Sequence, residues 1–452
     1  MTAASRLAPS AIEGLTAALA PVPCLTDPAS VKLKSRDFYW YSPLLKRQLR
    51  EVTGDIVAIA RDEADVMHVA RTCARLGVPL TVRGAGTGNY GQAMPLRGGV
   101  VLDMTGLDRI VEQAPGFVRV GAGKKLIDLD AETQPNGWEL RFHPSTRRTA
   151  TIGGFIAGGS GGVGSINYGM LRDRGNVLAL RVVTVEPEPQ IIALRGDDVQ
   201  QAIHAYGTNG IITELEIALA PSWPWVDAVV AFSGIMEALR FGQALAEADA
   251  VIKKLITPID WGAAQYFKPL RRHLPEGKAI CLAMIAAPSL EPFRALAARF
   301  GGTLCYEAPP GGGDVPPLYE FSWNHTTLHA LKVDRTITYL QTRYPDDAPL
   351  ATVEKLIALF GDEVPMHAEF VRTGGRIVCI GLQLVRYTSD ARLAEIIRIH
   401  EDHGCIIFNP HTYVLEDGGM KTIDRAQVAF KRRADPQGLL NPGKMRGWAA
   451  SG

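Results

Sequence analysis

The sequence lacks an excess of charge of either sign. Its 48 Lys and Arg residues are nearly balanced by 47 Asp and Glu residues, which leaves a formal net charge of +1. Nucleic-acid-binding proteins usually present a basic field, and disordered chains combine high net charge with low hydrophobicity. A composition of 46% hydrophobic and 21% charged residues is instead typical of a globular protein. Neither nucleic-acid binding nor disorder is expected.

Paired cysteines and long apolar runs are also missing. No two cysteines have Cys-x-x-Cys spacing, so neither a zinc finger nor a disulfide framework is indicated. Nowhere do 18 apolar residues follow one another, and residues 1–20 have a weak amphipathic helical pattern rather than the apolar core of a signal peptide. We therefore expect a cytoplasmic protein without a secretion signal or membrane span. The six cysteines are Cys24, Cys73, Cys281, Cys305, Cys379 and Cys405.

The first half of the chain alternates between predicted strands and helices. Residues 55–60 predict a strand, residues 62–76 have the apolar spacing of a helix, and residues 78–83 again predict a strand. This is β-α-β order. Residues 177–187 and 210–221 alternate as half-buried strands do.

The pattern changes after a proline-rich segment. Because 452 residues exceed what one hydrophobic core usually supports, we expect two domains or one domain with a large insertion. Pro221-Ser222-Trp223-Pro224-Trp225 predicts a domain border. Beyond it the element order predicts an antiparallel sheet covered by helices, so the expected fold class is α+β. The predicted strands are 226–232, 279–286 and a pair around Gly374 and Gly375, and the predicted helices are 236–248, 290–300, 353–359 and 391–403.

Glycine is the unusual component, and many of the 46 glycines fall within residues 84–99 and 153–175. The run Arg83-Gly84-Ala85-Gly86-Thr87-Gly88 follows a predicted strand. Its glycines permit positive φ angles, so that N–H groups can converge on an anion such as a diphosphate. It has neither the Gly-Lys-Ser/Thr ending of a P-loop nor G-x-G-x-x-G spacing. An ordinary glycine turn is the alternative interpretation.

The second cluster, residues 143–175, is nearly free of large side chains between Gly153 and Gly162. A backbone of this kind can lie directly against a flat, bulky group. Together the two clusters resemble the flavoprotein family typified by vanillyl-alcohol oxidase and p-cresol methylhydroxylase, most closely its D-lactate and glycolate dehydrogenase branch. The segments that carry the resemblance are Pro79–Thr87, Pro144–Ser145, Thr151–Gly154, Tyr168–Gly169 with Asp173, Tyr206–Glu214 and Asp435–Lys444.

The resemblance implies FAD as the cofactor and a discontinuous FAD-binding domain of two α/β subdomains. This domain would comprise residues 1–222 and 409–452, interrupted by a substrate-binding cap domain at residues 223–408. In several relatives a His of the first glycine loop, or a Cys, bonds covalently to the flavin. That loop has no His here, and no Cys lies between Cys73 and Cys281, so we predict non-covalent FAD. The implied FAD-binding residues are Arg83, Gly84, Ala85, Gly86, Thr87, Gly88, Pro144, Ser145, Thr151, Gly153, Gly154, Gly158, Gly159, Tyr168, Asp173, Gly210, Ile211, Ile212, Asn441 and Lys444.

Oxidation of an alcohol or hydroxy acid by a flavin needs a group that accepts the hydroxyl proton. The related branch has a Glu-His-Gly motif near the end of the cap. Its nearest counterpart here is Asn409-Pro410-His411-Thr412-Tyr413, in which Pro410 replaces the Glu and Thr412 replaces the Gly. We predict His411 as base or substrate ligand, with Asn409 and Tyr413 as neighbours. A His that only caps a loop is the alternative.

An acidic substrate would also need a cation. Arg343 and Arg372 are predicted to attract such a substrate, and the alternative is that these cations lie on a solvated face. The histidine-rich metal motif of the related branch is missing. His325 and His329 have the i, i+4 spacing of helical metal ligands, and His367 and Glu369 would share one face of a strand. Since neither pair has a third ligand, no metal is predicted.

These residues predict an FAD-dependent oxidoreductase that transfers hydride from a small hydroxy acid or alcohol to the flavin N5. The electrons then pass to an acceptor that the sequence does not identify. One alternative is an oxygen-using oxidase of a phenolic or sugar substrate, and another is a flavin electron-relay subunit of a larger complex. Flavoproteins of this size commonly form homodimers, although no residue pattern here indicates an interface.

Overall fold

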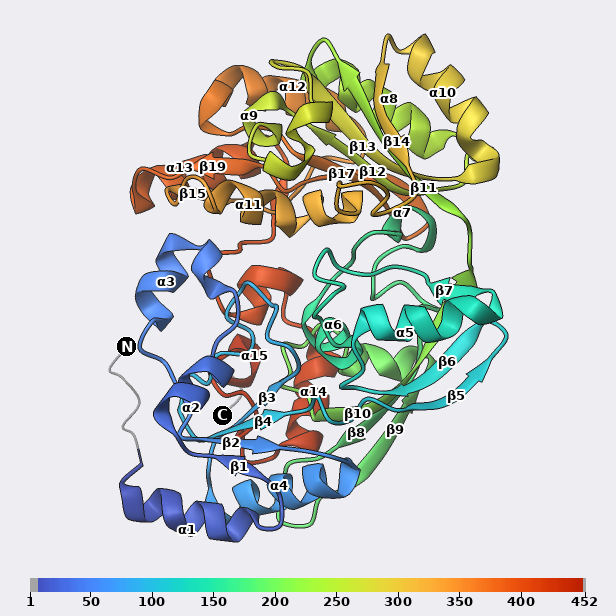
Figure 1. Cartoon of the computed structure of the whole chain (residues 1–452). Helices are drawn as coiled ribbons and strands as arrows, with labels where there is room; N and C mark the ends of the chain where they lie inside the picture. Colours follow the sequence, from blue (N-terminus) through green and yellow to red (C-terminus); the bar gives the residue numbers. More distant parts are fainter. Residues whose placement is uncertain (1–6, 450–452) are drawn as a thin grey trace.

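The computed structural model describes residues 7–449, which form two bodies. In Figure 1 the blue and cyan elements, and green elements up to β10, make the lower body, whereas the light-green, yellow and orange elements make the upper body. The red C-terminal helices α14 (Arg425–Ala434) and α15 (Arg446–Ala449) lie within the first body. The two ends of the chain therefore build one body, and the middle of the chain builds the second.

The first sheet of the N-terminal body is mostly parallel. Its order is β1 (Cys24–Leu25), β2 (Ile56–Ile59), β4 (Val100–Asp103) and β3 (Leu80–Arg83), with β1 antiparallel to β2. Parallel neighbours need a crossover, which α4 (Glu63–Leu76) supplies. The Asp62 side chain caps the start of α4, and Gly77 ends it with φ of 65°. The predictions for residues 55–60, 62–76 and 78–83 are confirmed.

The second sheet is antiparallel, in the order β5-β6-β10-β8-β9, with β7 also pairing with β10. The strands predicted within 177–187 and 210–221 are confirmed as β8 and β10. The strand bounds are β5 (Ile110–Ala114), β6 (Phe117–Gly121), β7 (Trp138–Leu140), β8 (Val177–Val183), β9 (Ile191–Arg195) and β10 (Ile211–Pro221). The remaining helices of this body are α1 (Pro9–Leu19), α2 (Pro28–Lys34), α3 (Pro43–Leu49), α5 (Leu126–Thr133), α6 (Ile152–Gly158) and α7 (Ser165–Tyr168). The amphipathic pattern of residues 1–20 is confirmed over α1, and residues 1–6 lie outside the described residues.

The C-terminal tail returns to the first sheet. Leu80 donates its N–H to the Leu439 carbonyl oxygen at 2.9 Å, and the Asn441 N–H donates to the Leu80 carbonyl oxygen at 2.7 Å. The buried Lys431 Nζ lies 2.8 Å from the Leu440 carbonyl oxygen and pairs with Asp435. The tail is thus part of the same hydrogen-bonded layer as β3.

The second body contains antiparallel sheets with helices packed against them. Their orders are β12-β13-β11-β14, β17-β18-β16-β20 and the pair β15-β19. The strands are β11 (Trp225–Phe232), β12 (Lys253–Ile259), β13 (Ala279–Ala286), β14 (Thr303–Ala308), β15 (Ile337–Tyr339), β16 (Thr342–Arg343), β17 (Ala368–Thr373), β18 (Arg376–Gly381), β19 (Leu384–Arg386) and β20 (Ile406–Ile407). The helices are α8 (Ile235–Glu247), α9 (Trp261–Ala264), α10 (Leu290–Arg299), α11 (Asn324–Leu331), α12 (Pro349–Phe360) and α13 (Asp390–Asp402).

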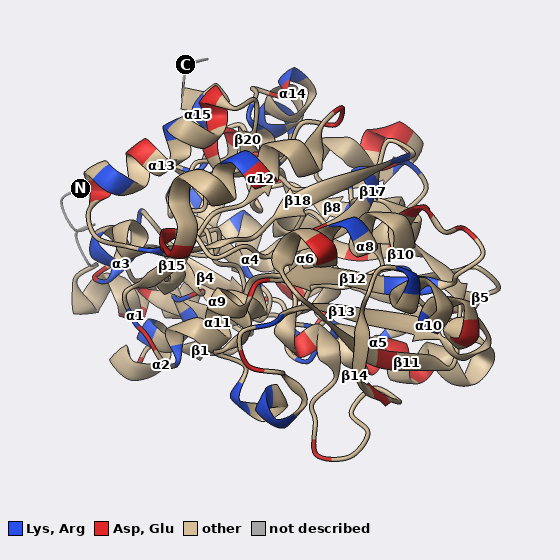
Figure 2. Ribbon diagram, turned by 90° about the horizontal axis from the view of Figure 1, so that it is seen from above, with Lys and Arg blue, Asp and Glu red and all other residues tan. Residues whose placement is uncertain are grey.

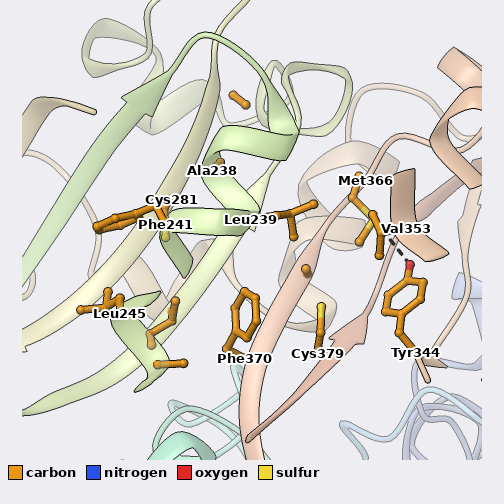
Figure 3. Close-up of a cluster of buried hydrophobic side chains, with 14 of the residues drawn as sticks. Ala238, Leu239, Phe241, Leu245, Cys281, Tyr344, Val353, Met366, Phe370 and Cys379 are labelled. Atoms are coloured by element: carbon orange, nitrogen blue, oxygen red, sulfur yellow. Dashed lines mark hydrogen bonds between the residues drawn. The ribbon is translucent and has the colours of Figure 1, made fainter. Parts of the chain in front are cut away.

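Helix α8 packs between two of these sheets. In Figure 3 its Leu239 points toward the side of Phe370 and Cys379, while Phe241 points to the other side, next to Cys281 of β13. A Cβ atom added at Gly242 of α8 would lie 2.7 Å from the Phe370 ring and 2.8 Å from the Pro258 ring, so the helix touches both sheets.

The strands and helices predicted beyond residue 225 are all present. The sequence patterns did not indicate β12, because every residue of that strand is buried and its sequence does not alternate.

Charged groups of both signs are interspersed over the same elements in Figure 2, in keeping with the small net charge. Among residues 7–449, no helix is both long enough and apolar enough to cross a membrane.

A buried ion pair joins the two bodies. Lys254 of β12 places Nζ 2.6 Å from Glu139 Oε1 of β7, and these side chains are only 5% and 3% exposed. Lys254 Nζ also donates to the Leu140 carbonyl oxygen at 3.1 Å, and Trp225 Nε1 donates to Glu139 Oε2 at 2.9 Å. Since the groups are mutually satisfied, removing one would leave a buried charge without a partner.

We therefore expect Glu139→Leu to lower the free energy of unfolding by about 3–5 kcal/mol. The double variant Glu139→Leu/Lys254→Met should recover most of this loss, because neither charge is then buried. Urea denaturation of the wild type, both single variants and the double variant measures the difference. A single variant as stable as the wild type, or a double variant no better than Glu139→Leu, would contradict the assignment.

Candidate functional site

A large cavity lies where the two glycine clusters meet the second body. Backbone of both clusters forms one wall, and side chains of the second body close the opposite side. The wall of the first body includes Gly84, Ala85, Gly86, Thr87, Gly88, Pro144, Ser145, Thr151, Gly153, Gly154, Gly158, Gly159, Gly161, Gly210 and Ile212. The opposite side includes Trp323, Asn324, Gln341, Thr342, Ile380, Gly381, Leu382 and Phe408.

The first glycine loop presents free backbone donors. Within the described part of the chain, the N–H groups of residues 84–88 have no hydrogen-bond partner. The loop turns at Gly86, whose φ of 69° favours glycine. The Arg83 guanidinium folds back onto the carbonyl oxygens of Arg36 and Ala85 and so holds the loop from behind. Converging unpaired N–H groups of this kind can bind a diphosphate.

The two glycine clusters approach each other too closely for side chains at the contact. A Cβ atom added at Gly84 would lie 2.1 Å from Thr151 Oγ1, and one at Gly153 would lie 2.5 Å from the Ala122 Cβ. The Thr151 side chain also accepts a hydrogen bond from the Gly154 N–H at 3.3 Å, which caps α6. The wall is consequently bare backbone, and a flat ring system can lie directly on it.

These features fit FAD. Free N–H groups suit its diphosphate, and a wall rich in glycine backbone suits its rings. Most of the residues that the sequence implied for FAD line the cavity. Arg83, Tyr168, Asp173, Ile211, Asn441 and Lys444 do not.

The implied residues outside the lining mostly hold its backbone in place. Asn441 Nδ2 donates to the carbonyl oxygens of Gln92, at 2.8 Å, and of Tyr206. Lys444 Nζ donates to the Gly91 carbonyl oxygen. Asp173 accepts from the Met170 N–H at 2.8 Å and from the Gly374 N–H at 3.1 Å. Their predicted direct contact with FAD therefore has no support from their positions, and their hydrogen bonds indicate a supporting role.

A second buried ionic group stands behind the first loop. Asp37 accepts from the N–H groups of Tyr39, at 3.0 Å, and of Ala93, at 3.1 Å. Burial raises the pKa of Asp37 and lowers the pKa of Lys444, and the attraction between the two charges opposes both shifts.

The predicted catalytic residues do not line the cavity. His411 is buried with Nδ1 2.9 Å from Ser42 Oγ, and burial lowers its pKa to about 4, so the ring is neutral. The Asn409 side chain accepts from the His411 N–H at 2.9 Å, and Tyr413 packs under the Lys444 ammonium, 5.4 Å from its ring centroid. These contacts lie away from the cavity lining, and a catalytic role for His411 stays a prediction.

The two predicted arginines also point elsewhere. Arg343 pairs with Asp346 at 2.9 Å. Arg372 donates to the carbonyl oxygens of Ile166, at 3.3 Å, and Gly375, at 3.1 Å. Neither position supports the prediction that these side chains bind an acidic substrate.

Neither of the two candidate metal pairs forms a metal centre. His367 Nε2 lies 3.0 Å from Glu369 Oε1, so the pair shares a strand face as predicted, but it is engaged in hydrogen bonds. His325 Nδ1 lies 3.3 Å from a Glu320 carboxylate oxygen, and His329 Nε2 lies 3.0 Å from the Glu320 carbonyl oxygen. Among the described residues, no group of three or more His, Cys, Asp or Glu side chains could hold a metal ion.

Glu369 instead supports the cavity wall. Its buried carboxylate accepts from the Trp323 N–H at 2.7 Å and from the Thr257 hydroxyl at 2.6 Å. Trp323 has φ of 50°, a strained conformation for a bulky residue, and it lines the cavity. The carboxylate thus holds in place a backbone that would otherwise be unfavourable.

Sequence reasoning missed a hydrogen-bonded row of neutral side chains that spans the two bodies. The Tyr90 hydroxyl of the first loop donates to Gln341 Oε1, and Gln341 Nε2 donates to Asn324 Oδ1 at 3.3 Å. Burial holds the pKa of Tyr90 well above its usual range, so its hydroxyl stays protonated. No spacing rule marks neutral amides, and only the nearness of Tyr90 to the glycine loop was visible in the sequence.

His204 also lines the cavity. Its Nδ1 bonds to the Gly159 carbonyl oxygen, and burial lowers its pKa to about 4. A Cβ atom added at Gly419 would lie 2.2 Å from His204 Nε2, so this nitrogen faces the backbone of that glycine.

Residues 54–190 match a family model described as an FAD binding domain. This match identifies an FAD-binding domain within residues 54–190 of the chain. The prediction of FAD as cofactor is therefore confirmed, and residues 84–88 and 151–159 of the cavity wall lie within the matched segment.

Curated relatives align with the part of the chain that contains the FAD-binding domain. A D-lactate dehydrogenase from Anaerostipes hadrus is 30% identical over 181 residues, 37% of each chain. The glycolate oxidase subunit GlcD of Escherichia coli (strain K12) is 29% identical over 179 residues, 37% of this chain and 35% of its own. An uncharacterized FAD-linked oxidoreductase from Mycobacterium tuberculosis is 30% identical over 168 residues, 35% of this chain and 36% of its own. The alignments thus span little more than a third of each relative.

A solved structure of alkyldihydroxyacetonephosphate synthase shares the fold over nearly the whole chain. The TM-score is 0.72 at 16% sequence identity, with 98% of this chain and 87% of that chain covered. The predicted α+β fold of a flavoprotein with a second, helix-covered antiparallel body is confirmed.

The close contact between the two glycine clusters predicts that one added methyl group at Gly84 weakens FAD binding. Gly84→Ala should raise the dissociation constant for FAD about tenfold, since overpacking costs about 1–3 kcal/mol and about 1.4 kcal/mol is tenfold in affinity. Titration of FAD-free protein with FAD, followed by visible absorption, measures this constant. Gly14→Ala on α1 is the control, because no atom lies within 4 Å of the added methyl group. FAD binding by Gly84→Ala as tight as that of the wild type would contradict the role of this contact in FAD binding.

Proposed function

We propose that this protein is an FAD-dependent oxidoreductase that oxidises a carbon bearing a hydroxyl group in a small alcohol or hydroxy acid. The observation that carries the proposal is the continuity of the cavity, which joins the glycine walls to Trp323, Gln341 and Leu382 of the second body. A cofactor on the glycine walls would leave its exposed face toward these side chains. Substrate and cofactor would then meet between the two bodies.

The proposed reaction converts an alcohol to a carbonyl compound. The C–H bond breaks and releases a hydride with two electrons, the O–H bond breaks and releases a proton, and a C=O bond forms. Bound FAD supplies the two-electron acceptor for this hydride. An electron acceptor of the cell then takes up the two electrons in a second half-reaction.

The protein's own residues contribute binding and orientation. The N–H groups of residues 84–88 would hold the diphosphate. Trp323, Leu382 and Phe408 cover the cavity with apolar surface. Gln341 and Tyr90 offer hydrogen bonds that can orient a hydroxyl group. His204 Nε2 faces the backbone of Gly419 and so is poorly placed to accept the hydroxyl proton, which we assign to solvent water.

The names of two relatives support a hydroxyl-bearing substrate, because lactate and glycolate are both hydroxy acids. The name of GlcD as a subunit also supports a second candidate, in which this protein works within a complex. In that case purified protein alone would not be reduced by substrate until a partner chain is added.

We further propose that FAD is bound without a covalent bond. No cysteine is among the described residues that line the cavity, and the Nδ1 atom of His204 is already hydrogen-bonded to Gly159. Precipitation with acid should therefore release the yellow flavin into the supernatant. Yellow colour that stays in the washed pellet would indicate a covalent bond.

The proposed activity predicts anaerobic bleaching of the visible flavin absorption. Purified protein mixed with a broad panel of alcohols, hydroxy acids, sugars and aromatic alcohols should lose this absorption with at least one member. Dithionite is the control that shows the flavin to be reducible. Oxygen uptake compared with dye reduction then separates an oxidase from a dehydrogenase. Absence of bleaching across the panel, with bleaching restored by a partner chain, would favour the relay function instead.

A further inference from the structure

The cavity contains no full charge on its walls. Of the described residues that line it, none is Asp, Glu, Lys or Arg. The ionisable side chains among them are Tyr41, Tyr90, His204 and Tyr206. Burial raises the pKa values of the three tyrosines and lowers that of the histidine, so all four are neutral at pH 7.

Four cations that adjoin the cavity lining in sequence, or that were predicted to bind FAD or substrate, are bound elsewhere. Arg83 donates to the carbonyl oxygens of Arg36 and Ala85, and Lys444 donates to that of Gly91. Arg343 pairs with Asp346, and Arg372 donates to backbone carbonyl oxygens. A substrate carboxylate would have to break one of these arrangements to pair with any of these four cations.

A carboxylate in such a cavity would be strongly disfavoured. Moving an unpaired ion out of water costs several kcal/mol unless a cation or several donors replace its hydration. The diphosphate of bound FAD would add negative charge to the same cavity, and like charges repel each other. Both effects act against an acidic substrate.

The polar groups that are present suit a neutral hydroxyl or carbonyl group. Gln341 uses Oε1 to accept from Tyr90 and one Nε2 hydrogen to donate to Asn324. Within the described residues, the other Nε2 hydrogen of Gln341 and the Asn324 Nδ2 group have no partner. The Thr342 hydroxyl accepts from Gln383 Nε2 at 2.8 Å, which leaves its own hydrogen free to donate. Gln341, Asn324 and Thr342 are thus neutral hydrogen-bond donors on the same side of the cavity.

Apolar side chains flank these donors. Trp323, Ile380, Leu382 and Phe408 line the same side of the cavity. A molecule with a hydroxyl group at one point and a hydrocarbon body around it would satisfy both kinds of contact.

The geometry points to an uncharged, largely apolar alcohol as the substrate, with its hydroxyl group oriented by the Gln341 and Asn324 amides. This assignment rests on the proposed oxidoreductase function and narrows it, because it excludes the small hydroxy acids. Gln341 is then a specificity-determining residue, which contacts the substrate from the second body while Tyr90 fixes its orientation from the first.

Matched pairs of compounds that differ only in charge test the substrate class. Suitable pairs are lactate and lactamide, glycolate and glycolamide, and mandelate and mandelamide, each in both enantiomers where they exist. Holoenzyme is mixed with each compound without oxygen, and both the bleaching rate and the perturbation of the flavin spectrum by binding are recorded. We expect each amide to bind and to bleach about 100-fold faster than its acid.

The two readouts keep this assignment distinct from the proposed function. A carboxylate that bleaches the flavin as fast as its amide overturns the neutral-substrate assignment and leaves the oxidoreductase proposal intact. Amides that perturb the spectrum without bleaching, while acids do neither, support the neutral site and contradict oxidation of these alcohols. Acids that perturb the spectrum more strongly than amides overturn the neutral site even if nothing is oxidised.

A substitution in the wall tests the role of Gln341. Gln341→Leu keeps the size of the side chain and removes its amide, so the kcat/KM for the best neutral alcohol should fall about 10- to 100-fold with normal FAD content. Gln190→Leu, at an exposed position before β9, is the matched control. Gln341→Lys should raise the ratio of acid to amide turnover at least about tenfold, because it supplies the missing cation. An unchanged ratio in Gln341→Lys, together with unchanged kinetics in Gln341→Leu, would overturn the assignment.

Discussion

The close contact between the first glycine loop and the start of α6 sets the geometry of the whole cavity. Gly84 leaves no room for even a methyl group against Thr151, and Gly153 is similarly close to Ala122. This contact joins the parallel sheet to the antiparallel sheet of the same body and leaves bare backbone facing the cavity. Because β3 also bonds to the C-terminal tail, the loop has fixed supports on both sides. FAD binding, and everything proposed about the substrate, depends on that wall.

None of the described residues that line the cavity carries a full charge, and charged side chains instead stabilise the backbone around it. Ionic groups brace the surrounding backbone: Lys444 binds the carbonyl oxygen of Gly91, and Glu369 binds the N–H of the strained Trp323. The pair Glu139 and Lys254 joins the two bodies that must meet around cofactor and substrate. Buried charges with partners stay in one arrangement, since losing a partner is costly. The cavity surface is left to neutral groups, and this distribution separates a charged scaffold from a neutral reaction site.

The sequence predicted what depends on backbone and periodicity. Glycine clusters are visible because few other residues can replace a glycine at a close approach such as Gly84, and strands such as β10 alternate as half-buried strands do. Side-chain roles were harder to predict. His411 was chosen from a partial motif, yet the Ser42 hydroxyl and surrounding packing hold it outside the cavity lining. Gln341 and Asn324 were invisible, because neutral amides have no characteristic spacing and become neighbours of Tyr90 only after the two bodies pack together.

A crystal structure of the protein with bound FAD would show directly which groups hold the cofactor. We expect the diphosphate against the N–H groups of residues 84–88, the ring system on the glycine walls, and Gln341 on the far side of the remaining space. The Arg83 and Lys444 side chains would keep their present bonds to backbone carbonyl oxygens. A diphosphate held by arginine or lysine side chains, or a flavin outside the cavity between the two bodies, would contradict the account.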